Sequence, residues 1–113
     1  MRKATEAVAA YEECAAEYGG AMQAGDSERA NAAYDRLIEI LGVLDKVGGR
    51  ADLRRLLHHP VAYVRLSAAT HLLRENPEVG LPVLEKLSGE TDLAGFDARM
   101  VLSEWKKGTL DLP

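Results

Sequence analysis

The sequence predicts an all-α protein of about six helices, joined by short loops and paired as three helical hairpins. Apolar residues recur at spacings of three and four, which is the period of a helix that buries one face. Gly, Pro and Asn residues interrupt these periodic segments where helices would end. No segment combines apolar–polar alternation with turn residues, so strands are not expected.

Two long helices are expected in the first half of the chain. The first carries an apolar stripe, is weakened at Gly19-Gly20 and ends at Gly25 at the latest. Asp26 or Ser27 is placed to cap the second helix, because a short polar side chain accepts hydrogen bonds from the free N–H groups of a first turn. Gly48-Gly49 ends the second helix.

Four shorter helices follow, and their apolar stripes place them at 51–57, 61–73, 79–87 and 93–107. Pro60 fits the first turn of the fourth helix, and Asn76-Pro77 ends it. The sixth helix is expected to bury its large apolar residues, which are Leu93, Phe96, Met100, Val101, Leu102 and Trp105.

A shift of 30 residues superimposes apolar positions of the two C-terminal hairpins. The matched pairs are Leu53 with Val83, Leu57 with Leu87, Leu66 with Phe96, Ala68 with Ala98, and Leu72 with Leu102. Hairpins that cannot bury their apolar face alone stack on one another. We therefore expect one domain, 1–113, in which a capping hairpin (1–49) precedes two stacked hairpins (50–76 and 77–108).

The segment His59-Pro60-Val61-Ala62-Tyr63-Val64-Arg65-Leu66-Ser67-Ala68-Ala69 resembles the HEAT-repeat pattern of Pro, Val-Arg and small residues. Over about residues 24–108 the chain is similar to small bacterial HEAT-like proteins known only as a domain of unknown function. The resemblance implies a right-handed α–α superhelix of HEAT or armadillo type and no assigned activity. It also implies that Arg65 is structural, bonded to an Asp or a carbonyl. Asp97-Ala98-Arg99 departs from the Val-Arg pattern.

No residue pattern indicates catalysis, a cofactor or a metal. The three imidazoles are His58, His59 and His71; adjacent residues point in different directions, and no pair has the spacing of metal ligands on one helix face. Cys14 lies on an apolar stripe beside acidic residues, which is typical of a core cysteine rather than a nucleophile. We therefore expect a protein that is not an enzyme.

Composition limits the location and the partners of the protein. The net charge is −4, which makes nucleic-acid binding unlikely. No run approaches the roughly 20 apolar residues of a membrane span, and Glu6 and Glu12 interrupt the only segment that could suggest an export signal. A lone Cys14 suits a reducing compartment, so we expect the cytoplasm.

The middle hairpin is an arginine-rich island, because residues 50–74 hold five Arg and one Asp, which gives net +4. We expect a protein-interaction module, such as an immunity or accessory protein, with a concave face lined by the fourth and sixth helices. The alternative is phosphate or nucleic-acid backbone binding through the arginines. A third possibility is that Arg54 and Arg55 pair with acids of the first two helices. Candidate partner contacts are Tyr63, Arg65, Arg74, Arg99, Arg54 and Arg55.

Overall fold

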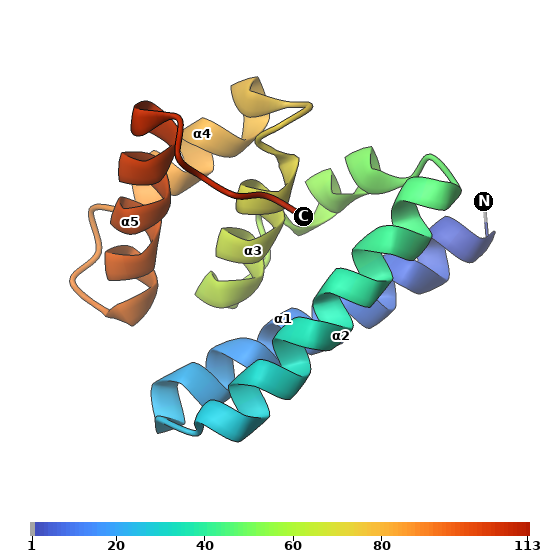
Figure 1. Ribbon diagram of the computed structural model, residues 1–113, viewed down its shortest axis with the longest axis horizontal. Helices are drawn as coiled ribbons and strands as arrows, with labels where there is room; N and C mark the ends of the chain where they lie inside the picture. The colour runs from blue at the N-terminus through green and yellow to red at the C-terminus, as the bar shows by residue number, and fades with distance from the viewer. Residues whose placement is uncertain (1) are drawn as a thin grey trace.

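A computed structural model describes residues 2–113, and every regular element in that range is a helix (Figure 1). In chain order the elements are α1 (Arg2–Ala24), α2 (Ser27–Lys46), the 3₁₀-helix η1 (Arg50–Leu56), α3 (Ala62–Leu72), α4 (Pro77–Leu87) and α5 (Leu93–Lys107). The all-α prediction is confirmed for the described residues, which contain no strand. A regular right-handed superhelix stays a prediction.

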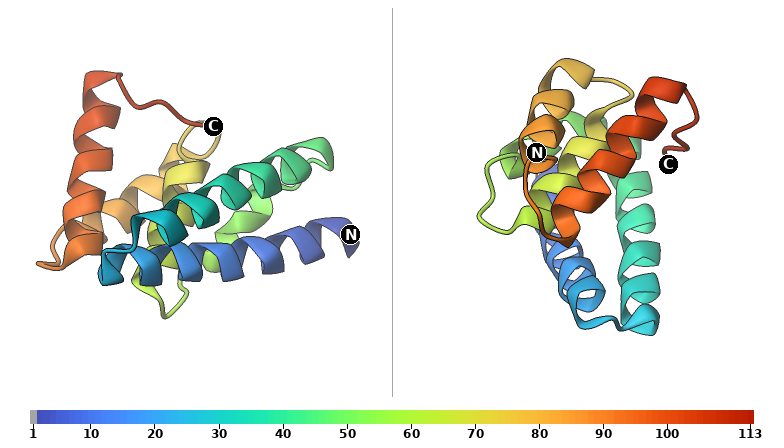
Figure 2. Two further views of the ribbon diagram at one scale, coloured as in Figure 1. Left: turned by 60° about the horizontal axis from the view of Figure 1, so that its bottom comes forward. Right: turned by 90° about the vertical axis from the view of Figure 1, so that its left-hand side faces the viewer.

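The helices α1 and α2 form a long antiparallel hairpin along one side of the molecule (Figures 1 and 2). Gly25 turns the chain with a φ of 70°, a left-handed conformation that a residue with a Cβ adopts at a cost. Of the two predicted caps, Asp26 is the one used, since its carboxylate accepts a hydrogen bond of 3.1 Å from the backbone N–H of Arg29. The hairpin turn therefore follows local sequence chemistry.

Gly19 does not weaken α1, which continues as one helix from Arg2 to Ala24. This glycine instead marks a close approach between α1 and α3. A Cβ at Gly19 would lie 2.5 Å from the Cβ of Tyr63, inside any real contact distance. The prediction of a helix weakness at Gly19 is therefore wrong, because packing against α3, and not local propensity, explains the residue.

The third element is a 3₁₀-helix and not the expected α-helix. It spans seven residues, which is short for an α-helix, whose first turn is costly to nucleate, although it is long for a 3₁₀-helix. It still buries Leu53 and Leu56 against the core. The three leucines of the predicted stripe are therefore buried as expected, whereas its Ala51 is exposed and the helix type differs.

Helix α3 lies at the centre of the fold, where it contacts α1, η1, α4 and α5. Eight of its eleven residues are buried. Small residues make this possible, since Ala68 and Ala69 are both fully covered and let neighbouring helices approach closely. At Gly80 of α4, a Cβ would lie 2.6 Å from the carbonyl oxygen of Ala69, so α3 and α4 are in backbone contact there.

Helix α5 buries a different face from the one predicted. Its buried residues are Ala94, Gly95 and Ala98, whereas the predicted core residues Leu93, Phe96 and Met100 are 38%, 52% and 48% exposed. Small residues occupy this face, and at position 95 the carbonyl oxygen of Glu90 in the preceding turn leaves no room for a side chain. The expectation that α5 buries its large apolar residues was therefore wrong at these three positions.

The 30-residue repeat therefore holds for the burial of some matched pairs and not of others. Ala68 and Ala98 are both fully buried, and Leu57 and Leu87 are only 7% and 3% exposed. Phe96, in contrast, is 52% exposed although its counterpart Leu66 is 6% exposed. The 30-residue shift thus relates the small residues at helix contacts and fails where a bulky side chain faces outward.

After α5 an extended segment, residues 109–113, returns across the molecule towards α3 (Figure 1). Two arginines hold it by its backbone carbonyls. Arg74 donates to the carbonyl of Leu112 at 2.5 Å, and Arg50 donates to the carbonyl of Pro113 at 3.0 Å.

Among the described residues, no helix is both long enough and apolar enough to cross a membrane.

Candidate functional site

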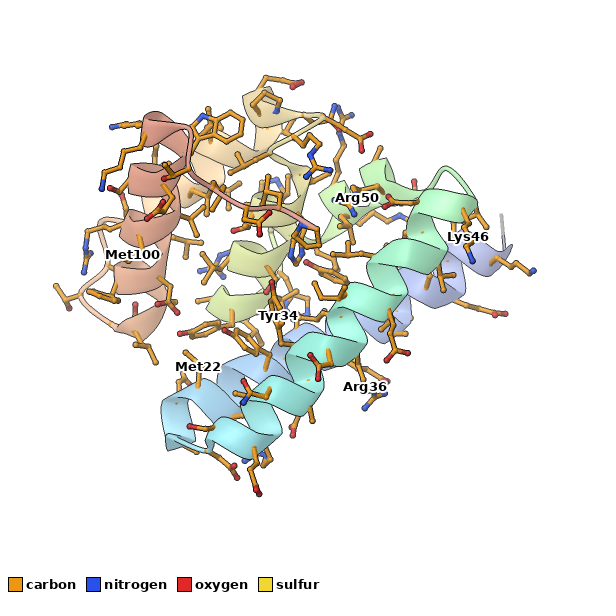
Figure 3. The ribbon with its side chains drawn as sticks, in the orientation of Figure 1. Met22, Tyr34, Arg36, Lys46, Arg50 and Met100 are labelled. Carbon is orange, nitrogen blue, oxygen red and sulfur yellow. The ribbon has the colours of Figure 1, made fainter. Side chains whose placement is uncertain are left out.

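A groove of about 310 Å³ runs between the α1–α2 hairpin and α5, and we call it the α5 groove. One wall carries Tyr18, Met22 and Tyr34, and the other carries Met100 and Val101. Figure 3 shows Met22 and Tyr34 on the hairpin, facing the side of the molecule where α5 carries Met100. Leu110 and Leu112 of the extended segment close one end. Most lining groups are therefore apolar.

The floor of the α5 groove includes polar groups from α3. His71 and Ser67 are 5% and 9% exposed, and both line the groove. The Oη of Tyr11 lies 2.6 Å from Nδ1 of His71, and the two rings meet edge to face. Burial, reinforced by the nearby charge of Arg50, lowers the pKa of His71 to about 4. The imidazole at the floor is therefore neutral at pH 7.

Three tyrosines form a cluster beside the groove. The ring centroid of Tyr18 lies 5.8 Å from that of Tyr34 and 6.0 Å from that of Tyr63. Tyr63 was expected among the partner contacts, but it is 1% exposed and its hydroxyl donates a 2.7 Å hydrogen bond to Asp97. Burial and this hydrogen bond raise the pKa of Tyr63. Tyr63 is a core residue that joins α3 to α5, and its covered ring is not a surface contact.

Three of the predicted contact arginines bond to backbone carbonyls. Arg65 donates from Nη1 to the carbonyl of His59 at 2.6 Å, which agrees with the structural role expected of it. This carbonyl lies in the turn just before α3, the helix that carries Arg65. Arg99 donates from Nη1 to the carbonyls of Ser88 and Glu90 at 2.7 and 2.9 Å and so ties α5 to the end of α4. Arg74, as described above, holds the extended segment. All three arginines therefore have structural partners.

The remaining two arginines lie on η1. Arg54 is exposed, and Arg55 lies 3.8 Å from Asp52 within the same element, so its ion pair is not with the first two helices. The arginine that reaches α2 is Arg50, whose side chain is 6% exposed and makes two hydrogen bonds to the carboxylate of Asp45 at 2.8 and 2.9 Å. Phosphate binding by this island stays a prediction.

The pairing of Arg50 with Asp45 was not predicted from the sequence, because only the net charge of the arginine-rich island was considered. One signal was available: Arg50 follows directly after the helix stop at Gly49, within reach of the last turn of α2. Arg50 also donates to the carbonyl of His71 at 3.3 Å. One side chain therefore links α2, α3 and the extended segment.

The described residues contain no cluster of three or more His, Cys, Asp or Glu side chains that could hold a metal ion. Cys14 is a free, buried thiol, 3% exposed, as a core residue should be. His59 contacts Glu12 at 2.7 Å and so attaches the loop before α3 to α1. These side chains have packing partners that account for their positions.

The fold and its groove define a small all-helical protein in which a central helix carries a hairpin on one side and two helices on the other. The chain is similar to the protein RPA1889 from Rhodopseudomonas palustris CGA009, known from a crystal structure. The TM-score is 0.85, the sequences are 27% identical, and the match covers 97% of this chain and 93% of that one. No protein-family model matches the chain, and no curated protein matches it.

Proposed function

We propose that this chain is a non-catalytic protein-interaction module that binds an apolar segment of a protein partner in the α5 groove. The observation that carries the proposal is the exposed apolar stripe on α5. Leu93, Phe96 and Met100 are 38%, 52% and 48% exposed and recur at spacings of three and four, which places them on one helix face. Contiguous exposed apolar side chains of this kind mark interaction sites.

The stripe is not needed to hold α5 in place. The helix is attached through Ala94 and Ala98, which are 1% and 0% exposed, and through the hydrogen bond between Tyr63 and Asp97. The large side chains on the other face therefore have no partner within the fold that compensates their exposure. A partner that covers them would gain roughly 25 cal/mol for each Å² of apolar surface removed from water.

The groove beside the stripe supports the same function. Met100 belongs to both, and Met22 and Tyr34 face it from the hairpin. Methionine adapts its shape to an incoming apolar surface, and tyrosine combines a large contact area with a polar tip. In the predicted α–α superhelix this would be the concave face, and we place the interaction in the cytoplasm, where Cys14 stays reduced.

The chain itself contains an example of the segment that suits the groove. Residues 109–113 are extended, and Leu110 and Leu112 line the groove at one end. Arg74 holds a carbonyl of this segment. A partner segment with spaced leucines would place its apolar side chains along the open part of the groove in the same way.

The test compares three forms of the protein as baits in a native extract of the source organism. The double variant Phe96→Ser/Met100→Ser removes the two most exposed residues of the stripe. Val43→Ser is the matched control, since Val43 is 47% exposed on α2 and does not line the groove. We expect a partner that wild type and the control retain at equal levels and that the double variant loses, measured by quantitative mass spectrometry.

Two results would contradict the proposal. One is a set of retained proteins that does not change when the stripe is removed. The other is a second copy of this chain as the sole species bound through the stripe, which would make the face a homodimer interface. Circular dichroism of all three forms provides the folding control.

A further inference from the structure

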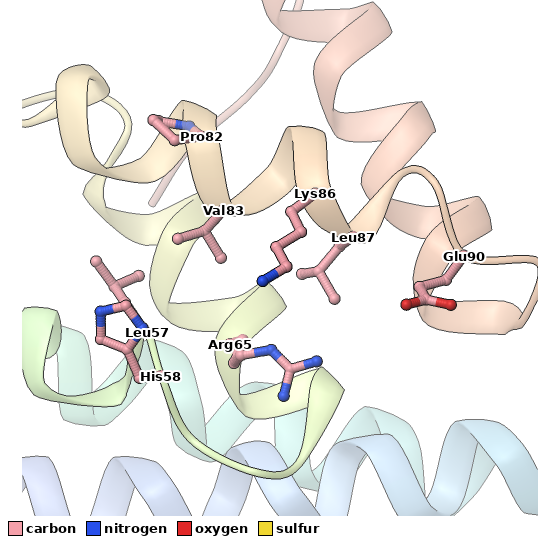
Figure 4. A pocket seen from close by; sticks show the side chains of 8 residues that line it. All are labelled: Leu57, His58, Arg65, Pro82, Val83, Lys86, Leu87 and Glu90. Atoms are coloured by element: carbon pink, nitrogen blue, oxygen red, sulfur yellow. The ribbon is translucent and has the colours of Figure 1, made fainter.

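A second cavity opens between the loop before α3 and one face of α4, and we call it the Lys86 pocket (Figure 4). Its volume is about 430 Å³, which falls within the roughly 300–1,000 Å³ of small-molecule sites. It shares no lining residue with the α5 groove. The Lys86 pocket is therefore a separate site from the groove of the proposed function.

One wall of the Lys86 pocket is apolar. Helix α4 contributes Pro82, Val83 and Leu87, whose spacing places them on one helix face together with Lys86. Leu57, at the end of η1, faces them from the other side. Pro82 lies inside the helix and exposes its ring at the rim. The wall suits the apolar body of a ligand.

Two cations face the same cavity. Figure 4 shows the Lys86 amine extending from α4 towards α3, with the Arg65 guanidinium beneath it. Within residues 2–113, neither side chain forms an ion pair with a carboxylate. Two like charges in one cavity repel each other, and an anion bound between them would relieve that repulsion.

Arg65 is fixed in a position that suits an anion. Its Nη1 donates to the carbonyl of His59 at 2.6 Å, which orients the planar guanidinium and leaves Nε and Nη2 available. Hydrogen bonds from charged donors to a carboxylate are about twice as strong as neutral ones. The Lys86 ammonium adds a mobile point charge on the opposite side.

Glu90 limits the charge that the pocket accepts. It lines the far end, away from Arg65 in Figure 4, and would repel a second negative group there. We propose that the Lys86 pocket binds a monocarboxylate with an apolar body. The carboxylate contacts Arg65 and Lys86, and the apolar body lies along Val83 and Leu87. The ligand is either a free medium-chain acid or the terminal carboxylate of an apolar peptide residue.

The test titrates octanoate into the isotope-labelled full chain and follows backbone amide shifts by NMR. Octanamide is the matched uncharged probe, and N-acetyl-leucine represents a peptide terminus. We expect octanoate to shift the amides of Arg65, Val83 and Lys86 at about 1 mM, the weak end of specific binding. Octanamide should bind roughly five- to tenfold more weakly, because it lacks the charge-assisted hydrogen bonds. Tighter binding of one acid than the other identifies the source.

Variants assign the effect to the pocket. Lys86→Gln should weaken octanoate binding roughly fivefold without unfolding the chain, since Lys86 is exposed, whereas Lys46→Gln on α2 should bind as wild type does. Equal affinities for octanoate and octanamide would overturn the proposal. So would equal affinities of the two variants, no binding of either acid, or shifts confined to Tyr34 and Met100 in the α5 groove.

Discussion

The hydroxyl of Tyr11 lies 2.6 Å from Nδ1 of His71, and this contact joins the middle of α1 to the end of α3 inside the core. Both groups are buried, and neither is exposed by more than 5%. A protonated imidazole could not accept at Nδ1 and would add a charge near Arg50. The Tyr11 oxygen could instead accept from a protonated Nδ1, so burial and the charge of Arg50, and not the contact itself, keep His71 neutral.

The first prediction is a loss of stability in mild acid. Folding lowers the pKa of His71 from its ordinary 6.5 to about 4, so the unfolded chain takes up the proton first as the pH falls. The stabilisation is complete above pH 6.5 and is lost between pH 6.5 and 4, with a slope of at most about 1.4 kcal/mol per pH unit. Urea unfolding of wild type and His71→Gln should give curves that converge as the pH falls; parallel curves would contradict the prediction.

The second prediction concerns the hydrogen bond between α3 and α5. Tyr63→Phe removes a hydroxyl that donates a hydrogen bond of 2.7 Å to the carboxylate of Asp97. This change should lower the free energy of unfolding by about 1–2 kcal/mol. Tyr34→Phe is the control, because Tyr34 is 40% exposed and its hydroxyl should cost close to nothing. Chemical denaturation measures both, and equal losses would argue against the assigned role.

The third prediction separates close contact from helix propensity. Gly80→Ala places a Cβ 2.6 Å from the carbonyl oxygen of Ala69 and should destabilise the fold by about 1–3 kcal/mol. Gly42→Ala, in the exposed part of α2 with nothing within 4 Å, should stabilise it by about 0.5–1 kcal/mol. Thermal unfolding should therefore move in opposite directions for the two variants. A Gly80→Ala variant that is as stable as wild type or more stable would show that α3 and α4 are not in contact there.

The fourth prediction concerns Arg50. Arg50→Ala leaves the carboxylate of Asp45 and the carbonyls of His71 and Pro113 without their donor, and should cost about 2–3 kcal/mol. Arg50→Lys should restore little of the lost stability, since an ammonium cannot form the paired hydrogen bonds to Asp45. Arg55→Ala, whose ion pair is exposed, should cost less than about 0.5 kcal/mol. A similar loss for Arg50→Ala and Arg55→Ala in urea unfolding would contradict this.

Local chemistry explains why much of the fold could be predicted from the sequence. The Asp26 side chain caps the first turn of its own helix, and Pro77 lies in the first turn of α4, so the roles of both at helix ends are visible in one short segment. The second-helix stripe at Leu37, Leu41 and Leu44 was likewise recognisable, because a helix with one broad apolar face has few ways to bury it.

The candidate site could not be predicted in the same way. Phe96 and Met100 fit a buried stripe as well as an exposed one, and only the close packing of Ala94 and Ala98 against the neighbouring helices decides which face turns inward. The same holds for Gly19, whose role depends on Tyr63, 44 positions away. Tertiary contacts, which a single periodicity does not encode, determine these residues.

In the proposed function, a protein partner covers the exposed stripe of α5. A photo-crosslinking amino acid placed at position 96, and in a matched variant at position 43, tests it most directly in living cells of the source organism. We expect one discrete heterologous adduct from position 96 that is absent from position 43. The same adducts from both positions, or none from position 96, would contradict it.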